Sequence, residues 1–73
     1  MYLVLELQKN GEQIASIITK HNSIRDAESK FYTVLAAAAV STVPLHSASL
    51  LTERGELIKN ESYEHIILEE VTE

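Results

Sequence analysis

The chain has 73 residues, a net charge of −5 at pH 7 and no cysteine, which excludes disulfides, zinc–thiolate sites and cysteine nucleophiles. The excess of acidic residues lies entirely after Asn60, so the preceding body is neutral and offers no basic surface for DNA or RNA. A domain this small buries only about 60% of the surface of its unfolded chain, so its core is marginal and we expect a homo-oligomer.

The N-terminal segment predicts a β-hairpin over residues 2–21. Leucines alternate with other residues from Leu3 to Leu7, which is the period of a strand, and Asn10-Gly11 is a strong hairpin signal. With Asn10-Gly11 as a two-residue loop, we expect the leucine face to form the core, and the second face, which carries Val4 and Ile17, to contact another subunit. The expected pairs on the leucine face are Leu7 with Ile14, Leu5 with Ser16 and Leu3 with Ile18.

A helix is predicted to begin after Asn22 and Ser23, which are both good N-cap residues, and to end before Pro44, which lacks a backbone donor. Its expected core positions are Ile24, Ala27, Phe31, Val34 or Leu35, and Ala38. Its second half is apolar all round, which is typical of a helix buried on every side, so we expect a contact between subunits there. The alternative is that alanine simply favours helix and tolerates exposure. The predicted oligomer interface consists of Ala36, Ala37, Ala39 and Val40.

A second hairpin is predicted over residues 45–63, with Arg54-Gly55 at the centre of its turn. A two-residue loop would pair His46 with Tyr63, and a three-residue loop would shift that pairing. The expected fold class is therefore α+β, with the order ββαββ: one antiparallel sheet packed on one helix, in a single domain over 1–65. Residues 66–73 are expected to form an acidic C-terminal tail, and the order of the strands in the sheet is left open.

No catalytic motif is present, because both glycines are turn residues and no carboxylate cluster lies outside the tail. We therefore expect a protein that is not an enzyme, with no cofactor and no metal site. Polar side chains beside the apolar end of the helix instead suggest a small-ligand pocket, in which Lys59 supplies charge and an aromatic ring stacks on the ligand. The alternative is an ordinary surface pair at a sheet edge. The predicted ligand-binding residues are His46, Ser47, Ser49, Lys59 and Tyr63.

Neither the N-terminal residues nor the apolar part of the predicted helix indicates membrane insertion. The N-terminal residues 1–8 lack the basic region of a signal peptide, and the apolar run from Val34 to Val40 is far shorter than the 20 or so residues that span a bilayer. We expect a soluble cytoplasmic protein with no membrane partner.

The segments AESKFYTVLAAAAVS, VPLHSASLLTERG and SYEH, which lie between Asp26 and His65, resemble a family of small uncharacterised proteins. These proteins are encoded by bacteriophages and prophages of Gram-positive bacteria, often from the gut. The resemblance implies a genetic setting rather than a mechanism, with the cytoplasm of an infected bacterium as the location. In that setting the expected function is a non-catalytic host-defence antagonist that sequesters a small nucleotide-like signal in an oligomer. The alternative is a phage structural, assembly or accessory protein that acts through protein–protein contacts.

Overall fold

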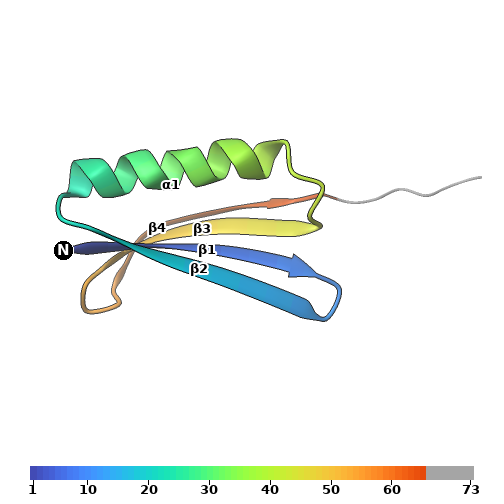
Figure 1. Ribbon diagram of the computed structural model, residues 1–73, viewed down its shortest axis with the longest axis horizontal. Coiled ribbons are helices and arrows are strands. Elements are labelled where there is room, and N and C mark those ends of the chain that lie inside the picture. The colour runs from blue at the N-terminus through green and yellow to red at the C-terminus, as the bar shows by residue number, and fades with distance from the viewer. Residues whose placement is uncertain (66–73) are drawn as a thin grey trace, which may run out of the picture.

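A computed structural model describes residues 1–65 as one four-stranded antiparallel sheet with one helix along one of its faces (Figure 1). The expected α+β fold in the order ββαββ is confirmed, and the strand order in the sheet is β2-β1-β3-β4. The prediction of an acidic tail over 66–73 lies outside the described residues. The elements are β1 (Tyr2–Asn10), β2 (Gln13–His21), α1 (Ile24–Ala39), β3 (Leu45–Thr52) and β4 (Leu57–Glu64).

The first hairpin turns one residue later than predicted. Asn10 pairs with Gln13, so the two-residue loop is Gly11-Glu12 and the predicted pairing of Leu7 with Ile14 is wrong. An Asn10-Gly11 loop of type I′ requires positive φ at both residues, whereas Gly11, at φ 65°, is the only residue of this turn that has one. A positive φ at the first loop residue alone is the pattern of a type II′ turn. The pairing shifts by two residues, which leaves every side chain on its predicted face.

Helix α1 begins where the sequence predicted and ends earlier. Ser23 is the N-cap, and its Oγ accepts a hydrogen bond of 3.2 Å from the backbone N–H of Asp26. The helix ends at Ala39 rather than just before Pro44, because Val40 leaves the helical region at φ −110° and ψ 8°. The N–H groups of Val40 and Ser41 donate to carbonyls three residues earlier, which tightens and closes the last turn.

The second hairpin has the longer of the two loops considered. The Thr52 N–H donates to the Glu56 carbonyl at 2.8 Å, which encloses a loop of three residues, 53–55, and Gly55, the last of them, has a positive φ of 90°. A β-bulge between Leu50 and Leu51 then restores the register. As a result His46 pairs with Tyr63, the pair expected for a two-residue loop, although the loop has three residues.

The core lies between α1 and the face of the sheet that carries Val4, not the face that carries the leucines of β1. The prediction that Leu3, Leu5 and Leu7 form the core is therefore wrong. Strands β2 and β3 are both antiparallel to β1 and so run parallel to each other, with α1 as their connection. Such connections are right-handed in about 98% of cases, so the chain direction decides which face the helix covers. The buried apolar residues are Val4, Ala27, Phe31, Val34, Ala38, Ala48 and Leu50.

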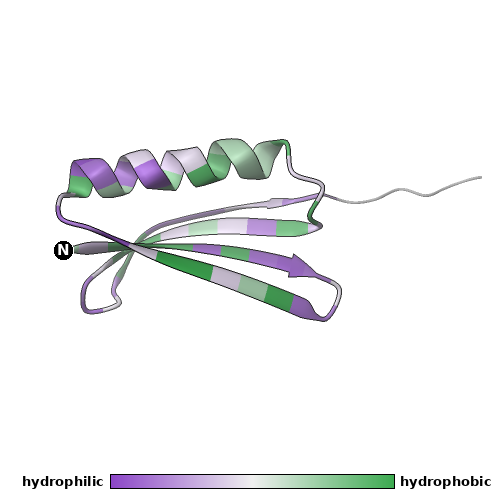
Figure 2. Ribbon diagram, in the orientation of Figure 1, coloured by the Kyte–Doolittle hydropathy of each residue, from purple (hydrophilic) through white to green (hydrophobic). Residues whose placement is uncertain are grey.

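The hydropathy of α1 changes along its length, from hydrophilic at the start to hydrophobic at the end (Figure 2). Four of its predicted core positions, Ala27, Phe31, Val34 and Ala38, are buried against the sheet, whereas Ile24 is exposed. Within residues 1–65, no helix combines the length and the apolar character needed to cross a membrane.

Candidate functional site

His46 is buried under α1 and is held by a carboxylate from the neighbouring strand. The residue is only 4% exposed, and its Nε2 lies 2.7 Å from Oε2 of Glu6 on β1. The Gln8 side-chain amide donates to the same oxygen at 3.1 Å. The second ring nitrogen, Nδ1, has no hydrogen-bond partner among the described residues. The imidazole is therefore part of the polar end of the core and is not presented to solvent.

Tyr63 and His65 form a second polar group where β4 leaves the sheet. Their rings are nearly parallel, 10° apart, with centroids separated by 6.2 Å. The His65 Nε2 lies 2.7 Å from the carbonyl oxygen of Ala38, one of the terminal carbonyls of α1 that lack a partner within the helix. The His65 backbone N–H donates to the Pro44 carbonyl at 2.7 Å. His65 therefore closes the C-terminal end of the helix against the sheet.

Lys59 joins β4 to the first half of α1. Its Nζ donates to the Tyr32 hydroxyl at 2.8 Å and lies 3.3 Å from a carboxylate oxygen of Glu28. The hydrogen bond to Tyr32, followed by the contact with Glu28, raises the pKa of the Lys59 ammonium above its ordinary value. The Lys59 ammonium is thus already paired with groups of the same chain.

Ser47 and Ser49 lie on the opposite face of the sheet from His46, because successive side chains of β3 alternate between faces. Ser49 Oγ accepts a hydrogen bond of 2.8 Å from the Asn60 side-chain amide of β4. The five residues predicted to bind a ligand are therefore divided between two faces. His46, Lys59 and Tyr63 belong to the helix-covered face, and the two serines belong to the other, so the five do not line one pocket within a single chain.

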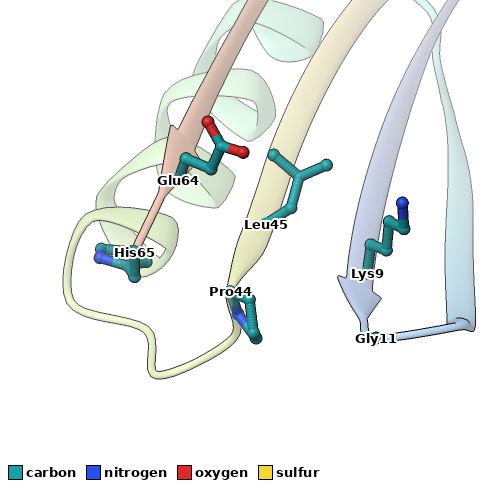
Figure 3. Close-up of a pocket in the computed structure, with 6 residues that line it drawn as sticks. All are labelled: Lys9, Gly11, Pro44, Leu45, Glu64 and His65. Atoms are coloured by element: carbon teal, nitrogen blue, oxygen red, sulfur yellow. The ribbon is translucent and has the colours of Figure 1, made fainter. Parts of the chain in front are cut away.

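Two open hollows flank the end of the sheet where β3 begins. The first, of about 350 Å³, has Leu45 between Glu64 of β4 and Lys9 of β1, with His65 beyond the end of β4 (Figure 3). Its lining residues are Lys9, Gly11, Pro44, Leu45, Glu64 and His65. The second hollow, of about 430 Å³, is lined by Gln8, Asn10, Gln13, Ile14, Ala15 and Val43. None of the five predicted ligand-binding residues lines either hollow.

The larger feature is the face of the sheet that α1 leaves uncovered, which we call the open face. Apolar side chains dominate it over β2 and β1, whereas over β3 and β4 hydroxyl and amide groups occupy the middle of the strands and leucines lie toward their ends. Ile14, Ile18 and Leu57 are 63%, 62% and 61% exposed. The alternation of leucines in β1 showed that these side chains share one face of the sheet. Apolar alternation alone, however, does not distinguish a face that forms the core from one that is left open. The open-face apolar residues are Leu3, Leu5, Leu7, Ile14, Ile18, Leu45, Leu51 and Leu57, and the polar ones over β3 and β4 include Ser47, Ser49, Asn60 and Ser62.

The predicted oligomer interface lies on the solvent side of the last turns of α1. Ala36, Ala37 and Ala39 are exposed, and Val40 is 83% exposed. This exposure is consistent with either alternative, a contact between subunits or alanines that simply tolerate solvent, so the interface stays a prediction.

Across residues 1–65, no group of three or more histidine, aspartate or glutamate side chains is arranged to hold a metal ion. Comparison of the chain with protein-family models, curated proteins and solved structures finds no match. The resemblance to phage and prophage proteins therefore stays a prediction, and the function must be argued from the geometry.

Proposed function

We propose that this protein is a non-catalytic interaction module that holds a partner protein against the open face of its sheet. The observation that carries the proposal is the set of apolar side chains on that face, which the chain leaves partly or largely in solvent. Exposed apolar patches rimmed by polar residues mark sites of protein–protein interaction. Among the alternatives considered from the sequence, this is the accessory or assembly protein that acts through protein contacts.

The distribution of side chains on the open face defines the chemistry of the partner. Over β2 and β1, the partner presents apolar side chains that bury Leu5 and Ile18. Over β3 and β4, it presents groups that exchange hydrogen bonds with Ser47 and Ser49. Specific protein interfaces combine well-packed apolar groups, which supply most of the affinity, with polar groups at their margin.

The setting we propose is the cytoplasm of a bacterium that carries the phage. The resemblance to small phage and prophage proteins of Gram-positive bacteria supports that setting. The neutral body and the absence of a basic surface favour a protein partner over DNA or RNA.

Photo-crosslinking in producing bacteria tests the proposal. A photoreactive residue at position 5, on the open face, should give a discrete adduct, whereas the same residue at position 29, an exposed site in the first half of α1, should not. The captured protein, once purified, should bind the wild-type chain and the Ser29→Lys variant equally, but Leu5→Lys at least tenfold more weakly. Circular dichroism checks that Leu5→Lys is folded, and Leu57→Lys, at a site 61% exposed, provides a second open-face variant. The absence of any adduct from position 5, or equal binding by all variants, contradicts the proposal.

Sequestration of a small nucleotide-like ligand is the second candidate, and it rests on the hollow lined by Lys9 and His65. That hollow has cationic, aromatic and apolar groups in reach of one small molecule. Glu64 lines the same hollow, however, and its carboxylate opposes a phosphate, which is why this function ranks second.

A thermal-shift panel of cyclic dinucleotides and ADP-ribose derivatives tests the second candidate, because a ligand that binds only the folded state raises its stability. A real ligand should raise the melting temperature of the wild-type chain and of Lys20→Ala, but not that of Lys9→Ala. If no compound shifts the wild-type chain, this function is excluded for those ligand classes.

A further inference from the structure

The two edges of the sheet are protected to very different degrees. On the β4 edge, a bulge and three charged side chains, Lys59, Glu61 and Glu64, discourage pairing with another strand. The β2 edge has no bulge over its nine residues, and only Lys20 and His21 can carry charge. The outward-pointing N–H and C=O groups of such an edge form a template for another strand.

β2 also exposes apolar side chains on both faces of the sheet. Ile14 and Ile18 lie on the open face, at 63% and 62% exposure, and Ile17 lies on the helix side, at 53%. Ile17 is exposed although it shares a face with the core, because α1 packs mainly over β3 and β1. In Figure 2 the β2 strand accordingly carries strongly hydrophobic segments away from the helix. A strand added at this edge would cover these isoleucines and would not meet the helix.

We propose that the occupant of the β2 edge is β2 of a second copy of this chain. The two strands run antiparallel about a twofold axis at Ser16, so that two four-stranded sheets join into one of eight strands. This proposal goes beyond the proposed function, because it concerns the β2 edge of the sheet, which meets the open face at Ile14 and Ile18, and does not require the partner protein.

The sequence of β2 is complementary to itself in this register. Ile14 faces Ile18 of the second copy, and Ile18 faces Ile14, so isoleucines meet isoleucines on the open face. Glu12, in the loop just before β2, faces Lys20 of the second copy, and both residues are exposed in the single chain. Opposite charges and β-branched apolar pairs directly across two strands are the arrangements that stabilise a sheet. The full set is Glu12 with Lys20, Gln13 with Thr19, Ile14 with Ile18, Ala15 with Ile17, and Ser16 with itself.

The neighbouring registers lack this complementarity. Twofold pairing of antiparallel strands places a residue opposite its own copy, so the nearest alternatives are centred on Ala15 or Ile17, and the next ones on Ile14 or Ile18. Centred on Ala15, the pairing sets Ile18 against Glu12, and centred on Ile17, it sets Ile14 against Lys20. Centred on Ile14, it sets Ile18 against Asn10, and centred on Ile18, it sets Ile14 against Asn22. Only the register at Ser16 satisfies the charges and the isoleucines together, and it also makes the open faces of the two copies continuous.

Charge reversal tests the register through sedimentation velocity of the full chain. The wild-type chain should be a dimer at concentrations of order 100 μM. Glu12→Lys and Lys20→Glu should each weaken dimerisation roughly tenfold, because each variant sets like charges opposite one another twice in the dimer. The double variant, Glu12→Lys with Lys20→Glu, should restore the dimer. A monomeric wild-type chain, or a dimer that neither reversal weakens, overturns the proposal.

Cysteine crosslinking locates the axis, since the natural chain has no cysteine. Ser16→Cys should give a disulfide-linked dimer on mild oxidation, because directly opposed residues have Cα atoms about 4.5–5.5 Å apart, within disulfide range. Ile17→Cys is the matched control and should stay largely uncrosslinked, since its own copy would lie diagonally, about 7–8 Å away. A dimer that crosslinks through position 17 and not 16 overturns this register. A dimer that Ala37→Glu dissociates, and that the charge reversals do not, overturns the β2 interface in favour of the helix.

Discussion

The two faces of the sheet both carry apolar residues, but the helix buries one face and leaves the other partly exposed to solvent. The helix-covered face contains Val4 and Leu50, which are almost fully buried, but also the polar groups of Glu6 and His46. The open face carries the leucines of β1 and remains partly in solvent. The more apolar alternation of β1 thus lies on the side that the helix does not cover.

This difference teaches that apolar character alone does not identify the core of a sheet. The helix must connect two parallel strands, and the handedness of that connection selects one face before side chains are compared. The polar groups of Glu6 and His46 on the covered face are accommodated because the imidazole Nε2 and the carboxylate pair with each other. The apolar groups on the open face are left for another molecule, which is the basis of the proposed function.

Truncation of matched leucines on the two faces should give the largest contrast. Leu50→Ala creates a cavity at a fully buried site and should lower the free energy of unfolding by about 2–5 kcal/mol. Leu57→Ala, at an open-face site that is 61% exposed, should change it by no more than about 0.5 kcal/mol. Urea denaturation followed by circular dichroism measures both. Equal losses would show that the open face is buried in solution, and the contrast between the faces would disappear.

Loss of the buried imidazole should have the next largest effect. His46→Ala leaves the Glu6 carboxylate, which is 17% exposed, without its partner and should cost about 3 kcal/mol of unfolding free energy. Ser47→Ala, one residue along β3 but on the open face, is the control and should stay within about 0.5 kcal/mol of wild type. The same denaturation experiment measures both variants. If His46→Ala were as stable as Ser47→Ala, the pair with Glu6 would not support the covered face.

The smallest expected effect is a pH dependence at the rim of the covered face. The pKa of Lys59 is raised in the folded chain by Tyr32 and Glu28, so its stabilising contribution is fully present below the ordinary lysine pKa of about 10.4. That contribution is lost as the pH rises through the raised value. Unfolding free energies of wild type and Lys59→Met, measured from about pH 8 to 11, should therefore converge at the alkaline end. A gap between the two proteins that widens as the pH rises would contradict this assignment.

Local sequence signals predicted the elements well because each depends on only a few neighbouring residues. Ser23 marked the start of α1, and the period of the apolar residues marked the side of the helix that is buried. The end of the helix was predicted too late, since Pro44 forbids continuation without requiring the helix to reach it. The register of the second hairpin was left open between two loop lengths. The structure combines the longer loop with the pairs expected for the shorter one, because a bulge between Leu50 and Leu51 compensates for the extra residue.

The candidate site was predicted less well, because it depends on which strands become neighbours. The sequence offered the pairing of His46 with Tyr63 as one of two registers, since that contact lies within one hairpin. It did not predict that Glu6, forty residues away from His46 along the chain, supplies the hydrogen bond to that imidazole. That contact exists because β1 pairs with β3, and the pairing of strands from different hairpins has no local signal.

The sequence by itself determined four strands, one helix and the face to which each side chain belongs, because alternation and helical period are properties of short segments. Only the tertiary structure decided the order β2-β1-β3-β4, the face that α1 covers and the edge left at β2. The physical reason is that these features follow from the pairing of distant strands and from the handedness of one connection. Both involve the whole chain, and together they leave the leucines of β1 on the open face.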